Sequence, residues 1–360
     1  MTRLEPQAVR TRPVPQPAHR RFGVGRAVRT GLLLALGVLL VAIALIWIRL
    51  ASFNDRVSTA GAASTSLLGG LTFGDEPVNV LIIGYGGEDH AGVYLSDSIN
   101  IASLDPTTDT TTIIPVPRDL WVEGNPGIPN NGKVNQAFAL GVSEGGFDEG
   151  GERAAEVVAS VTGLEIPHWI AIDFTGFAAI VDAVGGITIT NSVGFSYGGP
   201  DAGVTGEWDG TFATGELTLD GEGALYYART RYTDTASESS DFARSVRQQR
   251  VLSAVSAKLT GAGPAGLPSI FNVMDAADEQ IRTNMSVIDL GLFAMNSDPD
   301  RRLELAEDEI LQASTTTDGQ YVLVVIGRSG PSDYQPLQSF IRERLAEPPP
   351  SPLSSPLPGG

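Results

Sequence analysis

An uninterrupted apolar run near the N-terminus, from Gly31 to Ile48, most constrains what this chain can fold into. Its sequence, GLLLALGVLLVAIALIWI, contains no charged residue and approaches the ~20 residues that a helix needs to cross a bilayer. Trp47 and Arg49 stand at its end, where membrane proteins commonly place interfacial anchors. The run therefore predicts a transmembrane helix over residues 31–50.

The arginines that precede this run predict its orientation. Residues 1–30 carry Arg3, Arg10, Arg12, Arg20, Arg21, Arg26 and Arg29. Cytoplasmic segments beside a membrane span carry an excess of positive charge, so we expect 1–30 to be a cytoplasmic tail and the rest of the chain to be extracytoplasmic. The prediction is a single-pass type II protein of the cell membrane, with a Ser/Gly/Ala-rich tether over 51–75.

A cleaved signal peptide is the alternative for the N-terminus. The segment AGAAS at 60–64 has the small residues of a cleavage site. A signal peptide usually has an apolar core of ~7–15 residues that ends at the cleavage site. Here the apolar run is longer and ends well before Ala60, so we favour an uncleaved anchor.

The composition excludes several classes of function. The formal net charge is -18, which argues against nucleic acid as a partner because phosphate backbones are held mainly by Lys and Arg surfaces. The chain has no cysteine, so disulfides, thiolate metal sites and cysteine nucleophiles are impossible.

The hydrophobic pattern after the tether predicts an α/β fold. Buried strands alternate with amphipathic helices, which is typical of a three-layer α-β-α sandwich around a central mixed sheet. We expect a main domain over 76–262, a C-terminal part over 263–346 packed on the same domain, and a disordered Pro/Ser-rich tail over 347–360. The expected strands are 78–83, 98–104, 111–116, 168–172, 187–190 and 321–326, the last as an edge or closing strand. The main expected helices are 152–161, 174–183, 220–227, 241–259 and 334–345, with Asp220 as the cap of the third, and Lys133 and Asn135 are expected to open a further short helical segment.

Arginines gather in one stretch of this acidic chain, from Ala224 to Arg250: Arg229, Arg231, Arg244, Arg247 and Arg250. Guanidinium groups bind phosphate oxygens in pairs and stay charged at physiological pH, so the stretch indicates an anion site. The alternative is an exposed helix with surface ion pairs. Asp241, Arg244 and Gln248 share one stripe of the expected helix, and Phe242, Val246 and Leu252 are expected on its core-facing side.

A second polar group follows the third expected strand, where Pro117 ends the ladder before Arg118 and Asp119. Open α/β sheets bind ligands at such strand ends, although this pair alone is equally consistent with a local ion pair. The first strand runs into the loop 84–87, which is Gly-rich but has neither a Walker motif nor a dinucleotide fingerprint.

Seven segments, in this order and spacing, resemble the LytR-CpsA-Psr family of bacterial cell-wall enzymes. They are VNVLIIGYGG, LSDSINIASLDP, IIPVPRDLWV, KVNQAF, IDFTGFAAIVDAVGGITI, LDGEGALYYARTR and DFARSVRQQRVL, between Val78 and Leu252. The resemblance implies a membrane-anchored phosphotransferase. It would move a glycopolymer from a polyprenyl-pyrophosphate carrier to a hydroxyl of peptidoglycan or a related wall acceptor.

The resemblance also assigns roles to individual positions. It implies that the pyrophosphate is bound by Arg118, Arg229, Arg231 and Arg244, supported by Arg247 and Gln248. The catalytic and metal-binding carboxylates would be Asp97 and Asp241, with Mg²⁺ or alternatively Mn²⁺ as the metal. The supporting residues would be Asp119, Lys133 and Asn135.

One position departs from the family pattern. Many members carry a metal-binding Asp two residues after the Gly that ends the first strand, and this chain has Gly86 there. Glu88, Asp89 and His90 are possible substitutes. Alternatively, fewer protein ligands suffice, since Mg²⁺ often uses only one or two carboxylates together with substrate phosphates.

The expected chemistry agrees with these residue types. Arginines and a divalent cation neutralise the charge of a reacting pyrophosphate. A carboxylate, Asp97 or Asp241, would take the proton of the acceptor hydroxyl. Two other functions remain open: a pyrophosphatase that uses water as the acceptor, and a non-catalytic, membrane-anchored binder or regulator of wall polymer.

Overall fold

The computed structural model describes residues 48, 49, 51, 52, 56, 76–87, 92–108, 110–197, 210–230, 233–261, 272, 273, 275, 276, 280–286, 289, 290, 293 and 301–347. The chain divides into two units, Met1–Leu50 and Ala51–Gly360, and everything below concerns the second. Within the described ranges no helix is long and apolar enough to span a bilayer. Of the predicted span, only Ile48 and Arg49 are described. The predicted N-terminal tail, most of the tether and residues 348–360 also lie outside the described residues.

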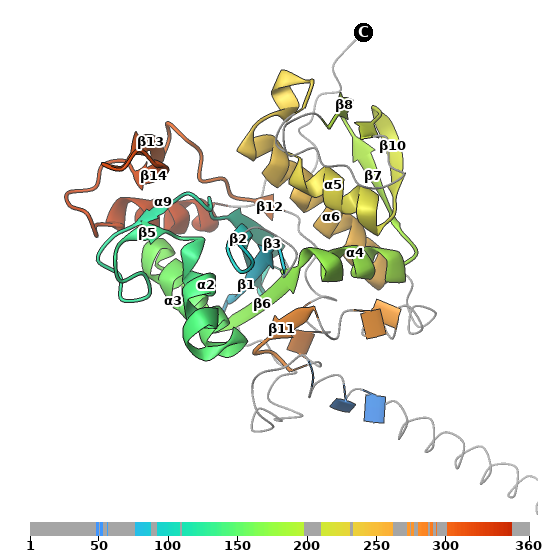
Figure 1. Ribbon diagram of the computed structural model, residues 1–360, viewed down its shortest axis with the longest axis horizontal. Coiled ribbons are helices and arrows are strands. Elements are labelled where there is room, and N and C mark those ends of the chain that lie inside the picture. Colours follow the sequence, from blue (N-terminus) through green and yellow to red (C-terminus); the bar gives the residue numbers. More distant parts are fainter. Residues whose placement is uncertain are drawn as a thin grey trace, which may run out of the picture. The chain divides into compact units, whose positions relative to one another are not determined.

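A six-stranded sheet forms the centre of the second unit (Figure 1). In spatial order its strands are β11 (Ile281–Thr283), β6 (His168–Asp173), β1 (Val78–Tyr85), β2 (Ser96–Asp105), β3 (Thr110–Pro115) and β12 (Arg301–Arg302). The β1–β6 and β3–β12 pairs are parallel and the other pairs are antiparallel. The prediction of an α/β fold with a central mixed sheet is therefore confirmed.

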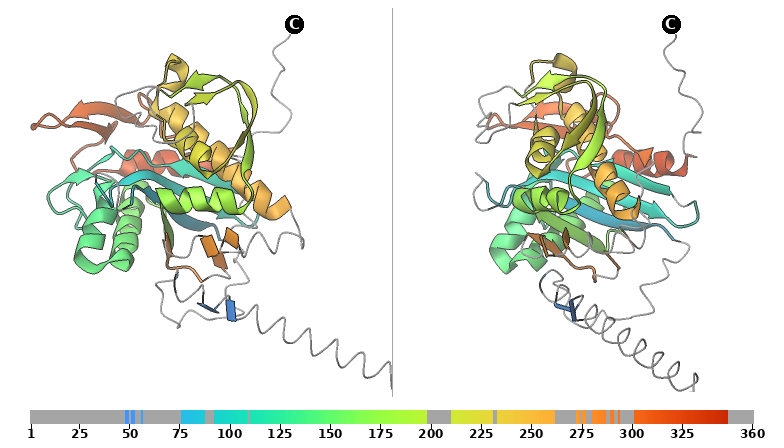
Figure 2. Two further views of the ribbon diagram at one scale, coloured as in Figure 1. Left: turned by 45° about the vertical axis from the view of Figure 1, so that its right-hand side comes forward. Right: turned by 90° about the vertical axis from the view of Figure 1, so that its right-hand side faces the viewer.

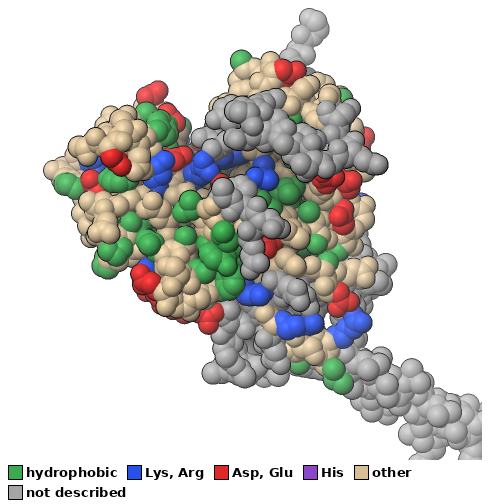
Figure 3. Space-filling view, in the orientation of Figure 1, with side chains coloured by type: hydrophobic (Ala, Val, Ile, Leu, Met, Phe, Trp, Pro, Cys, Tyr) green, Lys and Arg blue, Asp and Glu red, His purple; other side chains and the backbone are tan. Residues whose placement is uncertain are grey.

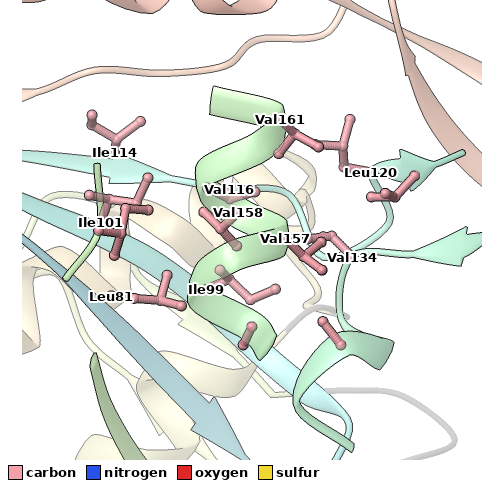
Figure 4. Close-up of a cluster of buried hydrophobic side chains, with 14 of the residues drawn as sticks. Leu81, Ile99, Ile101, Ile114, Val116, Leu120, Val134, Val157, Val158 and Val161 are labelled. Carbon is pink, nitrogen blue, oxygen red and sulfur yellow. The ribbon is translucent and has the colours of Figure 1, made fainter. Parts of the chain in front are cut away.

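One face of the sheet packs against α2 (Gln136–Gly145), α3 (Phe147–Thr162) and α9 (Gln335–Ala346). Alternate side chains of β1, such as Leu81 and Ile83, point into this core, because successive residues of a strand face opposite sides. Figure 4 shows Ile99 and Ile101 of β2 close to Val157 and Val158 of α3.

The other face carries α4 (Phe174–Ala183), α5 (Gly221–Arg229) and α6 (Asp241–Gly261), as Figure 1 shows. These helices form a second core with the short strands β7 (Ile187–Asn191), β8 (Phe195–Ser196), β9 (Thr211–Phe212) and β10 (Gly215–Leu219). Asp173 and Asp220 accept backbone hydrogen bonds at the N-termini of α4 and α5. These caps satisfy amide groups that the helix itself leaves unpaired, and the expected cap at Asp220 is confirmed.

The C-terminal strands differ from the prediction. The expected edge or closing strand became β14 (Tyr321–Val325), which pairs with β13 (Leu311–Thr315) in a separate two-stranded sheet and forms an isolated bridge from Leu323 to Leu120. Figure 2 shows this hairpin extending away from the central strands. The place beside β3 in the central sheet is taken instead by the two-residue β12.

Two local predictions were also wrong. Lys133 does not open a helix but lies in β5 (Gly132–Lys133), which pairs with β4 (Trp121–Val122), and α2 begins after Asn135. Among the α6 side chains that the structure describes, the most buried are Ala243, Arg247 and Val251, whereas Val246 and Leu252 are only partly buried; the side chain of Phe242 is not among those described. The cause is the polar pocket for Arg247 between α5 and α6, described below.

Candidate functional site

A cavity of about 410 Å³ opens where β2 and β3 approach α6. Its volume lies within the ~300–1,000 Å³ that is usual for small-molecule sites. Figure 3 shows Lys and Arg side chains in the hollow between the β13–β14 hairpin and the α5–α6 helices. The polar residues that line the cavity are Asp97, Ser98, Asn100, Arg118, Asp119, Ser240, Arg244, Gln248, Arg302, Glu304 and Glu307.

Four predicted site residues form a continuous chain of ion pairs at the strand ends. Arg118 Nη1 donates to Asp97 Oδ1 at 2.6 Å, and Arg118 Nε lies 3.6 Å from Asp119 Oδ2. Lys133 Nζ in turn donates to Asp119 Oδ1 at 2.6 Å. The chain therefore fixes the Arg118 guanidinium between two carboxylates at the cavity wall.

Backbone contacts hold this arrangement in place. The amide of Val134 donates to Leu120 O, and the amide of Asn135 donates to Arg118 O. Asn135 O accepts from the amide of Ser96, which ties the start of α2 to the start of β2. Asn135 is buried, and its backbone anchors the loop that carries Arg118.

Helix α6 supplies the opposite polar group. Arg244 and Gln248 are one turn apart and both line the cavity. Gln248 Oε1 accepts a hydrogen bond from Ser98 Oγ at 3.3 Å, and Ser98 Oγ accepts one from Asn100 Nδ2 at 2.8 Å. These bonds tie α6 to β2. Asp241 begins the helix, but its side chain is not among those described.

Arg247 does not reach the cavity, and its predicted role in binding pyrophosphate is wrong. Its side chain is fully buried, and it donates to Tyr227 O, Thr230 O and both the backbone and the carboxylate of Glu238. Burial lowers the pKa of this guanidinium, and Glu238 opposes the shift. Every donor nitrogen has a protein partner, so Arg247 fastens the segment between α5 and α6.

Arg229 lies beside the main cavity in a smaller, mostly apolar pocket of about 80 Å³ between the sheet and α4–α6. Its guanidinium carbon sits 3.9 Å from the centre of the Phe174 ring, a cation–π contact. The two cavities share Ser98, Asn100 and Gln248. Arg231, the other arginine predicted at this helix end, lies outside the described residues.

The contacts of Asp97 show whether it has a carboxylate oxygen available for a metal ion. No group of three His, Cys, Asp or Glu side chains suited to a metal ion occurs in the described part of the chain. The Arg118 bond uses Oδ1 of Asp97, and a carboxylate has a second oxygen. One or two carboxylates with substrate phosphates are enough for Mg²⁺, so the site fits the ion. Glu88, Asp89 and His90 are outside the described residues.

The carboxylate of Asp173 also lies close to the Gly-rich loop, but it caps a helix. A Cβ built on Gly87 would meet Asp173 Cβ at 3.4 Å. Asp173 caps α4, and burial raises the pKa of its carboxyl group. It is therefore a structural cap beside the position where the family often has an Asp.

Sequence reasoning missed several cavity residues. Ser98 could have been predicted, because it belongs to the same motif as Asp97 and stands one residue further along β2. Arg302 and Glu304 follow the resembling segments by about fifty residues, and no local motif marks them. Arg302 Nε donates to Glu304 Oε1 at 2.6 Å, and burial lowers the pKa of the guanidinium.

Comparisons with known proteins agree with this architecture. A polyisoprenyl-teichoic acid–peptidoglycan teichoic acid transferase TagU from Enterococcus faecalis is 30% identical over 226 residues, 61% of this chain and 66% of that protein. The protein of the same name from Bacillus mycoides is 31% identical over 213 residues, 59% and 61% of the two chains. The chain thus spans less than two thirds of the length of these relatives.

A solved structure shows the same fold. The crystal structure of Bacillus subtilis TagV superposes with a TM-score of 0.56 at 23% identity, covering 77% of this chain and 100% of that one. The model of the LytR_cpsA_psr family matches residues 54–329. Since that match takes in well over half of the sequence, this chain belongs to the LytR_cpsA_psr family.

Proposed function

We propose that this protein is an extracytoplasmic phosphotransferase that moves a glycopolymer from a polyprenyl-pyrophosphate carrier to a hydroxyl of peptidoglycan or a related wall glycan. The proposal depends on one observation. Arg118, which follows β3, and Arg244, on α6, line the same cavity. The names of the relatives, which are teichoic acid transferases acting on peptidoglycan, support the same substrates.

The hydrogen-bond donors that line the cavity support pyrophosphate binding. Arg118 Nε is buried and makes no hydrogen bond to a described residue, since the Asp119 Oδ2 atom with which it forms an ion pair is 3.6 Å away. A buried donor without a partner costs free energy that a phosphate oxygen would recover. Arg244 would bind the same group from α6, with Gln248 as a neutral donor and Arg229 on the side of the apolar pocket. Arg231 stays a predicted further donor. Lys133 and Asp119 would act by holding Arg118 in place.

The reaction then needs one bond to form and one to break. The acceptor oxygen attacks the phosphorus that carries the polymer, and the bond from that phosphorus to the bridging oxygen breaks. Polyprenyl phosphate leaves, the polymer keeps one phosphate, and the hydroxyl proton goes to a carboxylate, Asp97 or Asp241. Arg118 and Arg244 would stabilise the charge that gathers on the phosphoryl oxygens.

We propose Mg²⁺ as the cofactor, with Mn²⁺ as a possible replacement. Asp97 would supply one oxygen ligand and Asp241, at the start of α6, a second. When bound, the ion would neutralise negative charge on the pyrophosphate.

The apolar pocket supports a lipid-linked donor. Phe174, Phe177, Leu225 and Leu252 line it, and it adjoins the main cavity at Ser98 and Gln248. A prenyl chain could therefore lie between the sheet and α4–α6 while its pyrophosphate reaches Arg118. We propose that residues 31–50 anchor the protein in the cell membrane as a type II protein, which keeps this pocket within reach of the carrier.

Arg118→Ala and Arg244→Ala test the proposal. In the full chain in detergent, with a polyprenyl-pyrophosphate oligosaccharide as donor and a peptidoglycan oligosaccharide as acceptor, each variant should lose at least ~100-fold in transfer rate. Urea unfolding should show that both remain folded. Arg342→Ala, an exposed arginine on α9, is the matched control and should keep full activity. Unchanged transfer in Arg118→Ala would refute the assignment.

Product analysis separates the two other functions. A pyrophosphatase would release polymer phosphate at the same rate with and without the acceptor. A non-catalytic binder would retain the donor but give no product in the unmodified protein, and Asp97→Ala would not change its affinity. A phosphodiester-linked conjugate that forms only with acceptor supports the transferase.

A further inference from the structure

Part of the cavity wall comes from the C-terminal part of the chain and does not belong to the apolar pocket. Arg302, Glu304, Leu305 and Glu307 follow or belong to β12, and Leu323 comes from β14. None of these residues lines the pocket beside Phe174. The cavity therefore has a carrier side, at Ser98 and Gln248, and a second side built from elements that the family motifs do not include.

The charge of this second wall does not suit a phosphate group. Arg302 and Glu304 form an ion pair at 2.6 Å, so together they carry no net charge. Glu307 adds a carboxylate that is exposed to the cavity. A phosphate would be repelled by Glu307, whereas a carboxylate oxygen readily accepts hydrogen bonds from neutral hydroxyl groups.

An aromatic ring stands next to this carboxylate. Tyr321 Oη donates to Glu307 Oε1 at 3.1 Å. The Tyr321 side chain is 47% exposed, one of the few large apolar side chains at the surface of the described chain. A tyrosine offers a flat apolar face and a polar end, which together with a carboxylate suits a sugar ring that has apolar C–H faces and hydroxyl edges.

The direction of the reaction decides which sugar this is. In phosphoryl transfer the attacking and leaving oxygens lie roughly in line on opposite sides of the phosphorus. Under the proposed function the leaving polyprenyl phosphate lies toward the apolar pocket at Ser98 and Gln248. The attacking hydroxyl then arrives from the wall that contains Glu307, beside which Tyr321 stands just outside the residues that line the cavity. The cavity is also larger than a pyrophosphate group alone would fill.

We infer that Glu304, Glu307 and Tyr321 form the binding site for the acceptor sugar, the one that carries the attacking hydroxyl. The inference rests on the proposed transferase function and names the acceptor side of its site. Glu307 and Tyr321 bind the sugar directly. Arg302 is a positioning residue, because its contact with Glu304 holds that carboxylate at the wall.

The test separates acceptor from donor kinetics in the full chain in detergent. Transfer rates are measured for Glu307→Gln and Tyr321→Ala while the concentration of a peptidoglycan oligosaccharide is varied, and then while that of the donor is varied. Tyr321→Phe keeps the ring and removes the hydroxyl. Glu309→Gln is the matched control, since Glu309 is a nearby exposed carboxylate that pairs with Arg344 outside the cavity.

Glu307→Gln and Tyr321→Ala should raise the KM for the acceptor roughly tenfold, the effect of one or two lost contacts, and leave the KM for the donor unchanged. Tyr321→Phe should give a smaller rise, and Glu309→Gln none. An unchanged acceptor KM in both main variants overturns the inference. An equal rise in the donor KM also overturns it, because the wall would then hold the donor sugar.

Calorimetric binding of the same oligosaccharide gives a readout that does not depend on turnover. If the unmodified protein binds the oligosaccharide but transfers nothing to it, the proposed function fails while the binding site is still tested. Weaker binding by Glu307→Gln and Tyr321→Ala supports the site in that case. If all four variants bind the oligosaccharide as tightly as the unmodified protein does, the inferred acceptor site is overturned.

Discussion

At the scale of single residues, the environment and not the residue type decides what an arginine does in this protein. Arg118 and Arg247 both pair with carboxylates, at 2.6 Å and 2.7 Å. Arg118 lines a cavity and keeps a donor that no described residue satisfies. Arg247 is enclosed by α5, α6 and Glu238, and its donors bind the protein itself. The first can therefore bind a ligand and the second stabilises the fold.

We predict that Arg247→Met lowers the free energy of unfolding by ~3–5 kcal/mol, because it leaves the Glu238 carboxylate and three backbone carbonyls buried without their partner. Urea unfolding of the full chain measures this loss. Arg342→Met on the exposed side of α9 should change stability by less than ~0.5 kcal/mol. If Arg247→Met unfolds like the parent protein yet binds the donor weakly, the guanidinium belongs to the substrate site after all.

At the scale of elements, close packing between α3 and β6 fixes how the sheet meets its helices. Gly151 lies in the middle of α3, and a Cβ there would stand 2.1 Å from Cε2 of Trp169. Trp169 is fully buried in β6. The missing side chain therefore allows the indole ring to lie against the helix backbone. A glycine in a helix costs ~1 kcal/mol relative to alanine, and this contact offsets that cost.

Gly151→Ala should consequently destabilise the protein, in spite of the better helix propensity of alanine. We expect a net loss of ~1–3 kcal/mol from overpacking, measured by urea unfolding and by the near-ultraviolet circular dichroism of Trp169. Gly330→Ala is the control, because a Cβ at Gly330 meets no atom within 4 Å. A stabilised Gly151→Ala variant would show that Trp169 can move away from the helix.

At the scale of the whole unit, the C-terminal helix completes a core that begins with the first strand. Leu337 and Ile341 of α9 are fully buried in the cluster that contains Leu81 of β1 and Val158 of α3. Tyr334 Oη also accepts a hydrogen bond from the amide of Glu123, next to β4. The first strand and the last helix that the structure describes thus share one core.

Leu337→Ala should lower the free energy of unfolding by ~2–5 kcal/mol, the usual cost of a cavity in a packed core. Glu343→Ala lies on the same helix but is exposed, so it should have little effect. Both are measured by urea unfolding, with the acceptor and donor KM values followed in parallel. A Leu337→Ala protein as stable as the parent would mean that α9 only covers the surface.

The sequence by itself determined the strands β1–β3, helix α4 and the cap at Asp220. It also determined that Arg118 follows a strand end. These features depend on apolar periodicity, proline and hydrogen bonds between neighbours along the chain, which are local. The resemblance of seven segments led to the family and to five of the polar residues that line the cavity: Asp97, Arg118, Asp119, Arg244 and Gln248.

Tertiary structure alone decided which arginines of the α5–α6 region meet the cavity. Arg244 and Arg247 differ by less than one helical turn, and only the packing of α5 and Glu238 turns Arg247 inward. The same holds for Arg302 and Glu304, which reach the site because β12 pairs with β3. Residues far apart in the chain come together through the burial of shared surfaces, and no pattern along the sequence records which surfaces are shared.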